Sequence, residues 1–294
     1  MAILTQQTLM SVIEEVGLIV DYQEALLASL RKSIRVTATE PIADESKLPV
    51  GSSKIGGLPD LPPDVDWPHW HDKSLSFVAQ INLADVASLD HDSLLPSQGL
   101  LSFFYNGYQW LEGEPFEPGM WEVIFTDIAV SPLQTLSEPL DFGEYNTLYQ
   151  PYRLKFDPEI TLPPIISYYG FKRLGYSYRN GIDEHLEEVL RRVDEIMYSD
   201  ADYTRSRLLG HPDQIQGDVF LEAEEARRGE KISEAEIYDD PTSGITDWQL
   251  LFQLDSEEEA GMMWGDVGRL YYCIRQTDLK ARAFEKTICT MQCS

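Results

Sequence analysis

Apolar and polar positions along the chain follow a pattern that occurs twice. Each copy contains a Gly-x-Pro-Asp corner, then an apolar run with a central glutamine, then a strand-like run opened by a glycine. The matched elements are residues 57–60, 77–82 and 99–104 in the first copy and residues 210–213, 250–255 and 268–273 in the second. Three matched elements in one order predict an internal duplication, with the two copies as halves of one domain.

Apolar residues recur at helical spacing in four stretches. Residues 5–16 place them on one face, and Gly17 follows as a suitable C-cap. A second helix is predicted over 22–32 and a short one over 219–229. The strongest pattern lies over 181–197, where a continuous apolar stripe lies opposite charged residues. Because this helix leads into the second copy, we expect it to bridge the two halves.

The other apolar runs are rich in Val, Ile, Phe, Tyr and Trp, which favours strands. Strands are expected over 35–39, 75–82, 99–105, 121–130, 153–162, 165–169, 248–255, 268–275 and 286–292. Segments rich in Gly, Pro or acidic residues are predicted to be loops, at 51–68, 107–121 and 230–246. The pattern predicts a mainly-β fold (α+β by count): a duplicated β-roll with two pseudo-equivalent halves and with peripheral N-terminal and bridging helices.

The length of 294 residues is enough for one large core. We expect a single domain over 1–294. Its parts would be a helical N-terminal layer over 1–50, a first half over 51–180, and a second half over 181–294 that includes the bridging helix. The N-terminal layer has no counterpart in the second copy, so we interpret it as an addition to the repeat.

The charge balance is strongly acidic. Fifty Asp and Glu residues stand against 23 Lys and Arg residues, a formal net charge of -27, and no Lys or Arg occurs between Ser74 and Tyr152. Such a surface repels phosphate backbones and anionic lipids, so binding to nucleic acid or to a membrane is not expected. The acidity either keeps the protein soluble or forms a face that docks a basic protein partner.

The start of the chain has no basic n-region or apolar h-region, and no window reaches the about 18 apolar residues of a membrane helix. The three cysteines, Cys273, Cys289 and Cys293, form no even framework and are expected to be reduced thiols. Their spacing lacks the histidine companions of a zinc site. We expect a cytoplasmic protein without a cofactor or a metal site.

Motifs of both copies resemble the bacterial YwqG-like family. The resemblance covers about residues 50–294 and is carried by residues 53–62, 67–68, 75–83, 209–218, 263–271 and 292–294. It implies a mainly-β, roll-like fold with an internal duplication and peripheral helices. It implies no reaction, because the family has no established activity and therefore no catalytic residues to carry over.

The two corners supply the first candidate site residues. Asp60 and Asp213 occupy equivalent positions, and a pseudo-twofold axis could bring both carboxylates to one cleft. There they would divide acid and base roles or hold a hard cation. Alternatively, each carboxylate accepts hydrogen bonds from nearby amides and stabilises its own turn.

Gln80 and Gln253 interrupt the matched apolar runs. A buried amide requires hydrogen-bond partners, which the corner loops, the other glutamine or a polar pocket would supply. In the segment 264–269, two glycines permit close approach of the backbone. Asp266 and Arg269 either brace this turn as an ion pair, or Arg269 joins Lys54 and Arg173 in binding an anion.

Two functions are compatible with these residues, and no P-loop, dinucleotide fingerprint or nucleophile elbow is present. The first is a non-enzymatic binding protein, possibly immunity-like, that engages a basic partner through acidic and aromatic residues such as those of 103–121. The second binds a small molecule, or hydrolyses one, in a carboxylate-lined cleft between the halves. A closed seam between the halves together with an exposed apolar patch rimmed by acidic residues would favour the binding protein. A pocket in which the candidate residues converge, with shifted carboxylate pKa values, would favour the small-molecule function.

Overall fold

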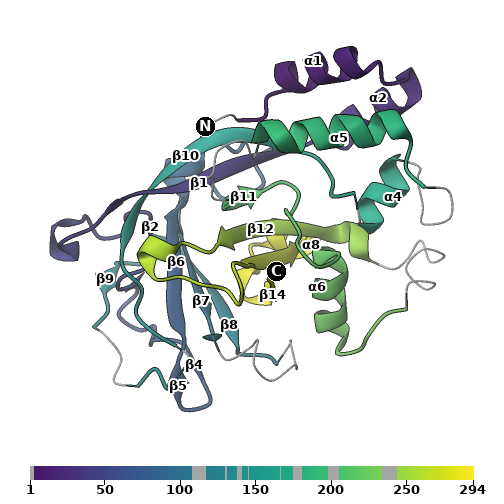
Figure 1. Ribbon diagram of the computed structural model, residues 1–294. Coiled ribbons are helices and arrows are strands. Elements are labelled where there is room, and N and C mark those ends of the chain that lie inside the picture. Colours follow the sequence, from purple (N-terminus) through teal and green to yellow (C-terminus); the bar gives the residue numbers. More distant parts are fainter. Residues whose placement is uncertain are drawn as a thin grey trace.

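One large antiparallel sheet forms the centre of the computed structural model (Figure 1). The structure describes residues 3–107, 117–129, 131–137, 141–144, 146–165, 167–174, 181–197, 205–233 and 244–294. The strands of this sheet are β1 (Arg31–Pro41), β2 (Lys54–Ile55), β6 (Ser76–Asn82), β7 (Leu100–Tyr105), β8 (Trp121–Thr126), β10 (Tyr152–Thr161), β11 (Arg207–Leu209), β12 (Trp248–Asp255), β13 (Arg269–Arg275) and β14 (Ile288–Gln292). The predicted mainly-β class is confirmed.

The strand order is β14-β13-β12-β11-β1-β10-β2-β6-β7-β8. Thus β1 and β10 pair at the centre, and four strands lie on either side of them. The β6–β7 ladder shifts register between Phe77 and Ala79, and the β12–β13 ladder shifts between Leu250 and Phe252. Both irregularities fall in the apolar runs that match in the sequence. Two short pairs lie outside this sheet, β3 (Asp60–Leu61) with β9 (Gln134–Thr135) and β4 (His69–Trp70) with β5 (Lys73–Ser74).

Helices cover one end of the sheet and one of its sides (Figure 1). They are α1 (Gln6–Val16), α2 (Val20–Ala28), α3 (Leu83–Val86), α4 (Tyr168–Leu174), α5 (Glu184–Met197), α6 (Val219–Arg228) and α8 (Gln276–Ala281). Short 3-10 turns are η1 (Glu45–Lys47), η3 (Ile245–Asp247), η4 (Glu258–Ala260) and η5 (Phe284–Lys286). The predicted helices at α1, α5 and α6 are confirmed. In the described part of the chain, no helix combines the length and apolar character needed to cross a bilayer.

The N-terminal predictions require one correction. The second helix was expected to reach residue 32, but α2 ends at Ala28 and β1 begins at Arg31. The Ser29 hydroxyl donates to the Leu26 carbonyl at 2.8 Å, close to the helix end. Beyond it, residues of β1 pair with β10 on one side and with β11 on the other. These long-range ladders override the local helical pattern.

A second correction concerns residues 165–169, which were expected to form a strand. Helix α4 begins there at Tyr168. The Ser167 hydroxyl accepts a hydrogen bond from the Gly170 amide at 2.9 Å, and the Asp218 carboxylate accepts one from the Tyr168 amide at 2.7 Å. These caps satisfy the first amides of the helix, and one of them comes from a residue 50 positions away. The tip of the predicted 107–121 hairpin and most of the 230–246 loop lie outside the described residues.

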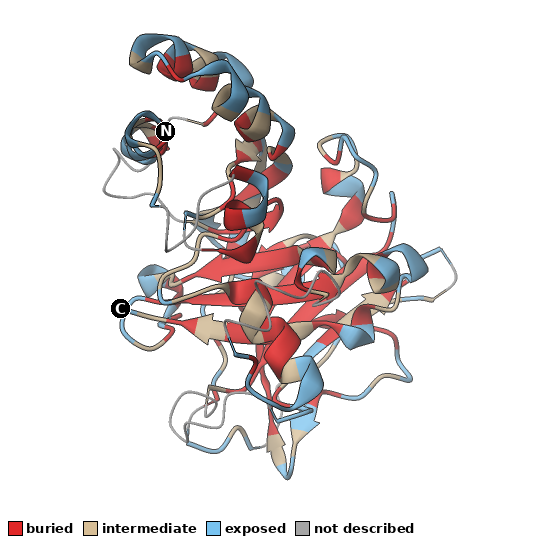
Figure 2. Cartoon of the chain, turned by 90° about the vertical axis from the view of Figure 1, so that its right-hand side faces the viewer, coloured by how far each residue is buried: buried red, intermediate tan, exposed pale blue. Residues whose placement is uncertain are grey.

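The sheet curls so that its two flanks face each other. Phe103 on β7 lies 4.8 Å from the Phe252 ring and 5.0 Å from the Tyr272 ring of the opposite flank. The Tyr272 hydroxyl donates to the Phe104 carbonyl at 3.1 Å. The Trp121 indole donates to the Thr287 carbonyl at 2.6 Å, which joins β8 to the start of β14. Residues of both flanks therefore belong to one buried apolar cluster. Figure 2 shows that the strands of the sheet consist largely of buried residues.

Candidate functional site

The first-half corner is held by a closed set of hydrogen bonds. The Asp60 carboxylate accepts from the Gly51 amide at 2.8 Å, the Gln80 side-chain amide at 2.7 Å and the Thr135 hydroxyl at 2.6 Å. The Asp60 amide in turn donates to the Gln80 carbonyl oxygen at 2.9 Å. Asp60 is only 2% exposed. This carboxylate acts as a structural acceptor at the corner.

The second-half corner repeats part of this arrangement and adds charge. The Asp213 amide donates to the Gln253 side-chain oxygen at 2.8 Å, and the Gln253 amide group donates to the Arg205 carbonyl. The Arg205 guanidinium lies 3.0 Å from the Asp213 carboxylate. Arg269 Nη1 and the Tyr271 hydroxyl both donate to the Asp213 carbonyl, at 2.9 and 2.8 Å. Asp213, Gln253 and Arg269 therefore converge at one place.

The remaining expected pairs are not formed. Arg269 Nε donates to Asp255 Oδ1 at 3.1 Å, and Asp266 lies on an exposed turn where its carbonyl accepts from the Ser294 amide. The Lys54 ammonium binds Glu45 and the Leu58 carbonyl, each at 2.6 Å. Arg173 lies 5.5 Å from the Tyr169 ring centroid. The three cations proposed as an anion site thus have three separate sets of partners.

Replacing Asp60 by Asn should destabilise the protein without affecting any ligand. An Asn side chain offers one acceptor oxygen to the three donors that now reach the carboxylate. We expect the free energy of unfolding to fall by about 1–3 kcal/mol, the cost of an unsatisfied buried donor. Urea denaturation measures this loss. An unchanged midpoint would show that the corner does not depend on the carboxylate.

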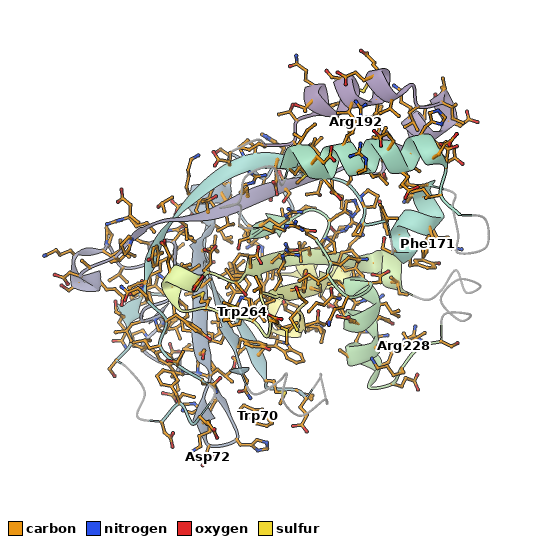
Figure 3. The ribbon with its side chains drawn as sticks, in the orientation of Figure 1. Trp70, Asp72, Phe171, Arg192, Arg228 and Trp264 are labelled. Atoms are coloured by element: carbon orange, nitrogen blue, oxygen red, sulfur yellow. The ribbon has the colours of Figure 1, made fainter. Side chains whose placement is uncertain are left out.

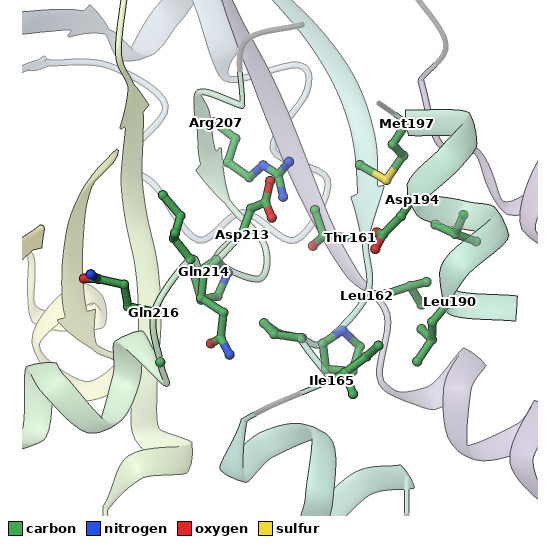
Figure 4. A pocket seen from close by; sticks show the side chains of 16 residues that line it. Thr161, Leu162, Ile165, Leu190, Asp194, Met197, Arg207, Asp213, Gln214 and Gln216 are labelled. Atoms are coloured by element: carbon green, nitrogen blue, oxygen red, sulfur yellow. The ribbon is translucent and has the colours of Figure 1, made fainter. Parts of the chain in front are cut away.

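A cavity of about 260 Å³ opens beside the second-half corner (Figure 4). Its walls come from α5, from the segment that follows β10, and from the segment that follows the 210–213 corner. The apolar lining consists of Leu162, Pro163, Pro164, Ile165, Leu190, Val193, Met197, Pro212 and Ile215, and the polar side chains are Thr161, Asp194, Arg207, Asp213, Gln214 and Gln216. The pocket is therefore amphiphilic.

Two carboxylates lie on opposite walls of this pocket (Figure 4). Asp194 points into it from α5, while Asp213 lies beside Arg207 on the far wall. The pKa of Asp194 is raised, because partial desolvation and the negative charge of Asp213 outweigh the opposing effect of the Arg205 guanidinium, and the residue is exposed to solvent. Asp213 was predicted from the corner motif. Asp194 was missed because nothing in the helical spacing distinguishes it from other polar residues of α5.

Buried ion pairs fix Arg207 at the edge of the pocket. Arg207 Nε lies 3.2 Å from Glu159 Oε1, and its Nη1 donates to the His211 carbonyl at 3.3 Å. Arg35 lies 3.1 Å from the other oxygen of Glu159, and the Ser33 hydroxyl donates to Oε1 at 3.2 Å. All three charged side chains are almost fully buried. Such pairing holds the guanidinium in one orientation.

The histidines of the His69-Trp70-His71 stretch make local contacts. The His69 ring lies 3.2 Å from the Ser74 hydroxyl, and the His71 ring packs against Trp70 with centroids 4.1 Å apart. Among the described residues, no group of three or more His, Cys, Asp or Glu side chains is placed to hold a metal ion.

The family model of Domain of unknown function (DUF1963) matches residues 53–293. The match includes both corners, the whole of α5 and every residue that lines the pocket. The chain belongs to this family. The DUF1963 match begins after α1, α2 and β1, so β1 contributes a central strand from outside the matched region. No curated protein matches the chain. The narrower YwqG-like resemblance stays a prediction.

Proposed function

We propose that this DUF1963 protein binds a small organic molecule in the pocket between α5 and the second-half corner. The observation that carries the proposal is the amphiphilic lining, in which an apolar wall lies beside two opposed carboxylates. Concave sites with mainly apolar walls and a few placed polar groups are typical of small-molecule sites. A carboxylate with a raised pKa inside such a site is a further feature of functional pockets.

The polar side chains that line the pocket are arranged for binding a ligand rather than for hydrolysing one. The Thr161 hydroxyl accepts from the His211 amide at 2.8 Å and donates to the Arg31 carbonyl at 3.2 Å, so it is not poised as a nucleophile. The Arg207 guanidinium is held by Glu159. These fixed groups can orient a ligand. We therefore propose binding as the activity of the pocket.

A thermal-shift screen of small metabolites tests this proposal. A ligand at a hundred times its dissociation constant adds about 2.7 kcal/mol to the free energy of unfolding, which is a readily measured shift. We expect the shift to be lost in Asp194→Asn and kept in Asp60→Asn, which alters the corner of the other half. A hit that both variants bind equally would place the ligand outside the pocket.

A second candidate function is engagement of a basic partner by the turn at 263–267. Figure 3 labels Trp264, which lies in this turn. Trp264 anchors the turn, because its ring is buried against Tyr105 and Tyr149 at centroid distances of 5.6 and 5.7 Å. Met263 and Val267 remain 47% and 59% exposed, in a segment that also carries the exposed acids Glu258, Glu259 and Asp266. Exposed apolar side chains with an acidic rim suit an apolar and basic surface.

The backbone conformation of Val267 leads to a testable prediction about this turn. Its φ of 50° is a left-handed conformation that a β-branched residue rarely adopts. Val267→Gly should therefore raise the free energy of unfolding by about 0.5–1 kcal/mol, since the strain removed exceeds the entropy cost of glycine. Affinity capture with the wild type and with Val267→Gly as baits then tests the contact: if Val267 touches a partner, the variant should capture less of it. Equal capture by the two baits would show that the turn does not contact the partner.

We propose that the two strand sets flanking β1 and β10 descend from one ancestral unit. The support comes from matched order, matched register shifts and matched glutamine-to-corner hydrogen bonds. In such a case the two corners would have diverged, one keeping a structural role and the other bordering the pocket.

A further inference from the structure

A single buried side chain holds one wall of the pocket in place. Residues 215–217 form part of this wall, and Gln292 of β14 is fully buried beside them. Gln292 Oε1 accepts hydrogen bonds from the Ile215 amide at 2.8 Å and from the Gln216 amide at 3.0 Å. Its Nε2 donates to the Gly217 carbonyl at 3.1 Å. Gln292 is therefore a positioning residue for this wall.

Glu222 of α6 helps to fix the direction in which the Gln292 amide points. Glu222 Oε1 accepts a hydrogen bond from Gln292 Nε2 at 2.8 Å. Reversal of the side-chain amide would turn its two hydrogens toward the backbone amides of the wall, so that donors would face donors. The acceptor at Glu222 thus favours the orientation in which Gln292 holds the wall.

A second carboxylate lies one helical turn from Glu222. Asp218 caps α6, four positions earlier in the chain, and side chains at this spacing are neighbours on a helix. The Asp218 carboxylate accepts from the Phe220 amide at 3.0 Å and from the Tyr168 amide at 2.7 Å. Tyr168 begins α4, which follows the pocket residues 163–165. Hydrogen bonds therefore connect this carboxylate pair to two walls of the same pocket.

The surroundings of the pair oppose ionisation. Desolvation raises the pKa of the Glu222 carboxyl to about 7, and the negative charge of Asp218 adds to this shift. Desolvation also raises the pKa of Asp218, but its backbone hydrogen bonds favour the charged form. The polar and titratable groups that act on Glu222 are Asp218, Lys231, Cys273, Thr290 and Gln292, of which Gln292, Thr290 and Lys231 oppose the rise. Glu222 is therefore the member of the pair that titrates near neutral pH.

We propose that Glu222 and Gln292 form a proton-dependent clasp on the pocket wall, a regulation that rests on the small-molecule function proposed above. While Glu222 is neutral, it accepts from Gln292 and the wall is held. When Glu222 is ionised, repulsion by Asp218 and the gain of hydration turn its side chain out to solvent, and Gln292 loses this acceptor.

The clasp makes binding depend on pH. For a carboxyl that titrates near pH 7, the neutral share falls from about nine-tenths at pH 6 to about one-tenth at pH 8. Affinity scales with the share of protein in the competent state. A small molecule that needs this wall should therefore bind about tenfold more weakly at pH 8 than at pH 6.

The backbone amides of the wall report the clasp without any ligand, in proton–nitrogen NMR correlation spectra recorded over a pH series. We expect the amide protons of Ile215 and Gln216 to move upfield as the pH rises, with a midpoint near pH 7, because their acceptor is released. Glu222→Gln has nearly the same shape and is neutral at every pH, so both amides should keep their low-pH positions. Asp218→Asn removes the like charge and should move the midpoint to lower pH.

The equivalent glutamine of the first half supplies an internal control. The Asp60 amide donates to Gln80 Oε1 at 2.9 Å and should not show this midpoint. An unchanged midpoint in Glu222→Gln would assign the titration to another group and overturn the proposal. Wall amides that do not titrate between pH 6 and pH 8 would show that the clasp does not open, and the small-molecule function would stand. A metabolite screen with no Asp194-dependent hit would instead remove that function, whatever the wall amides do.

Discussion

Replacing Glu159 by Gln is expected to lower the free energy of unfolding by about 3–5 kcal/mol, the usual loss when one partner of a buried ion pair is removed. Glu159 accepts Arg35 on one oxygen and Arg207 on the other, and its own side chain has no solvent exposure. The variant leaves two buried guanidinium groups without their counter-charge. Urea denaturation followed by circular dichroism measures the difference.

Asp157→Asn is the matched control for this variant. Asp157 lies on the same strand and pairs with Lys155 at 2.8 Å, but the lysine is well exposed. Exposed pairs contribute about 0–1 kcal/mol, so we expect a small change. Equal losses in the two variants would contradict the importance of the buried cluster.

Phe103→Ala is expected to cost about 3–5 kcal/mol of stability, as truncation of a buried aromatic side chain usually does. The reason is its position in the seam, between Phe252 and Tyr272 of the opposite flank. A double-mutant cycle with Phe252→Ala should give a coupling energy of about 0.5–1.5 kcal/mol, because the two rings are in direct contact.

Phe77 provides the control pair for this cycle. Its ring packs on Phe104 with centroids 5.4 Å apart, in a cluster separate from the seam. The cycle between Phe77→Ala and Phe252→Ala should therefore give a coupling energy near zero. If the cycle between Phe103→Ala and Phe252→Ala also gave no coupling energy, the flanks would not pack against each other in solution as described.

Local patterns in the sequence predicted much of the fold. The helical spacing of α1, α5 and α6 was sufficient, because each helix buries one apolar stripe. The strand pattern also located the ladders on both flanks. The failures, at the end of α2 and at the start of α4, occur where partners distant in sequence supply the hydrogen bonds.

The site was predicted only in part, for the same reason. The matched glutamines and corners led to Asp213, Gln253 and Arg269, which converge. Asp194 and Glu159 were missed, because each gains its environment from long-range packing. Glu159 lies in a strand along which polar and apolar residues alternate, and the sequence pattern alone places it on the exposed face. Only the pairing of β1 with β10 and β11 brings two arginines to it.

The central claim is that the pocket beside α5 binds an organic ligand. Methyl-selective NMR during a titration with the strongest hit of the metabolite screen tests it most directly, because the methyl groups of Leu190, Val193 and Met197 line the pocket. We predict saturable shift changes at these methyl groups, which disappear in Asp194→Asn. Shifts confined to methyl groups elsewhere, such as those of Met263 and Val267, would contradict the claim.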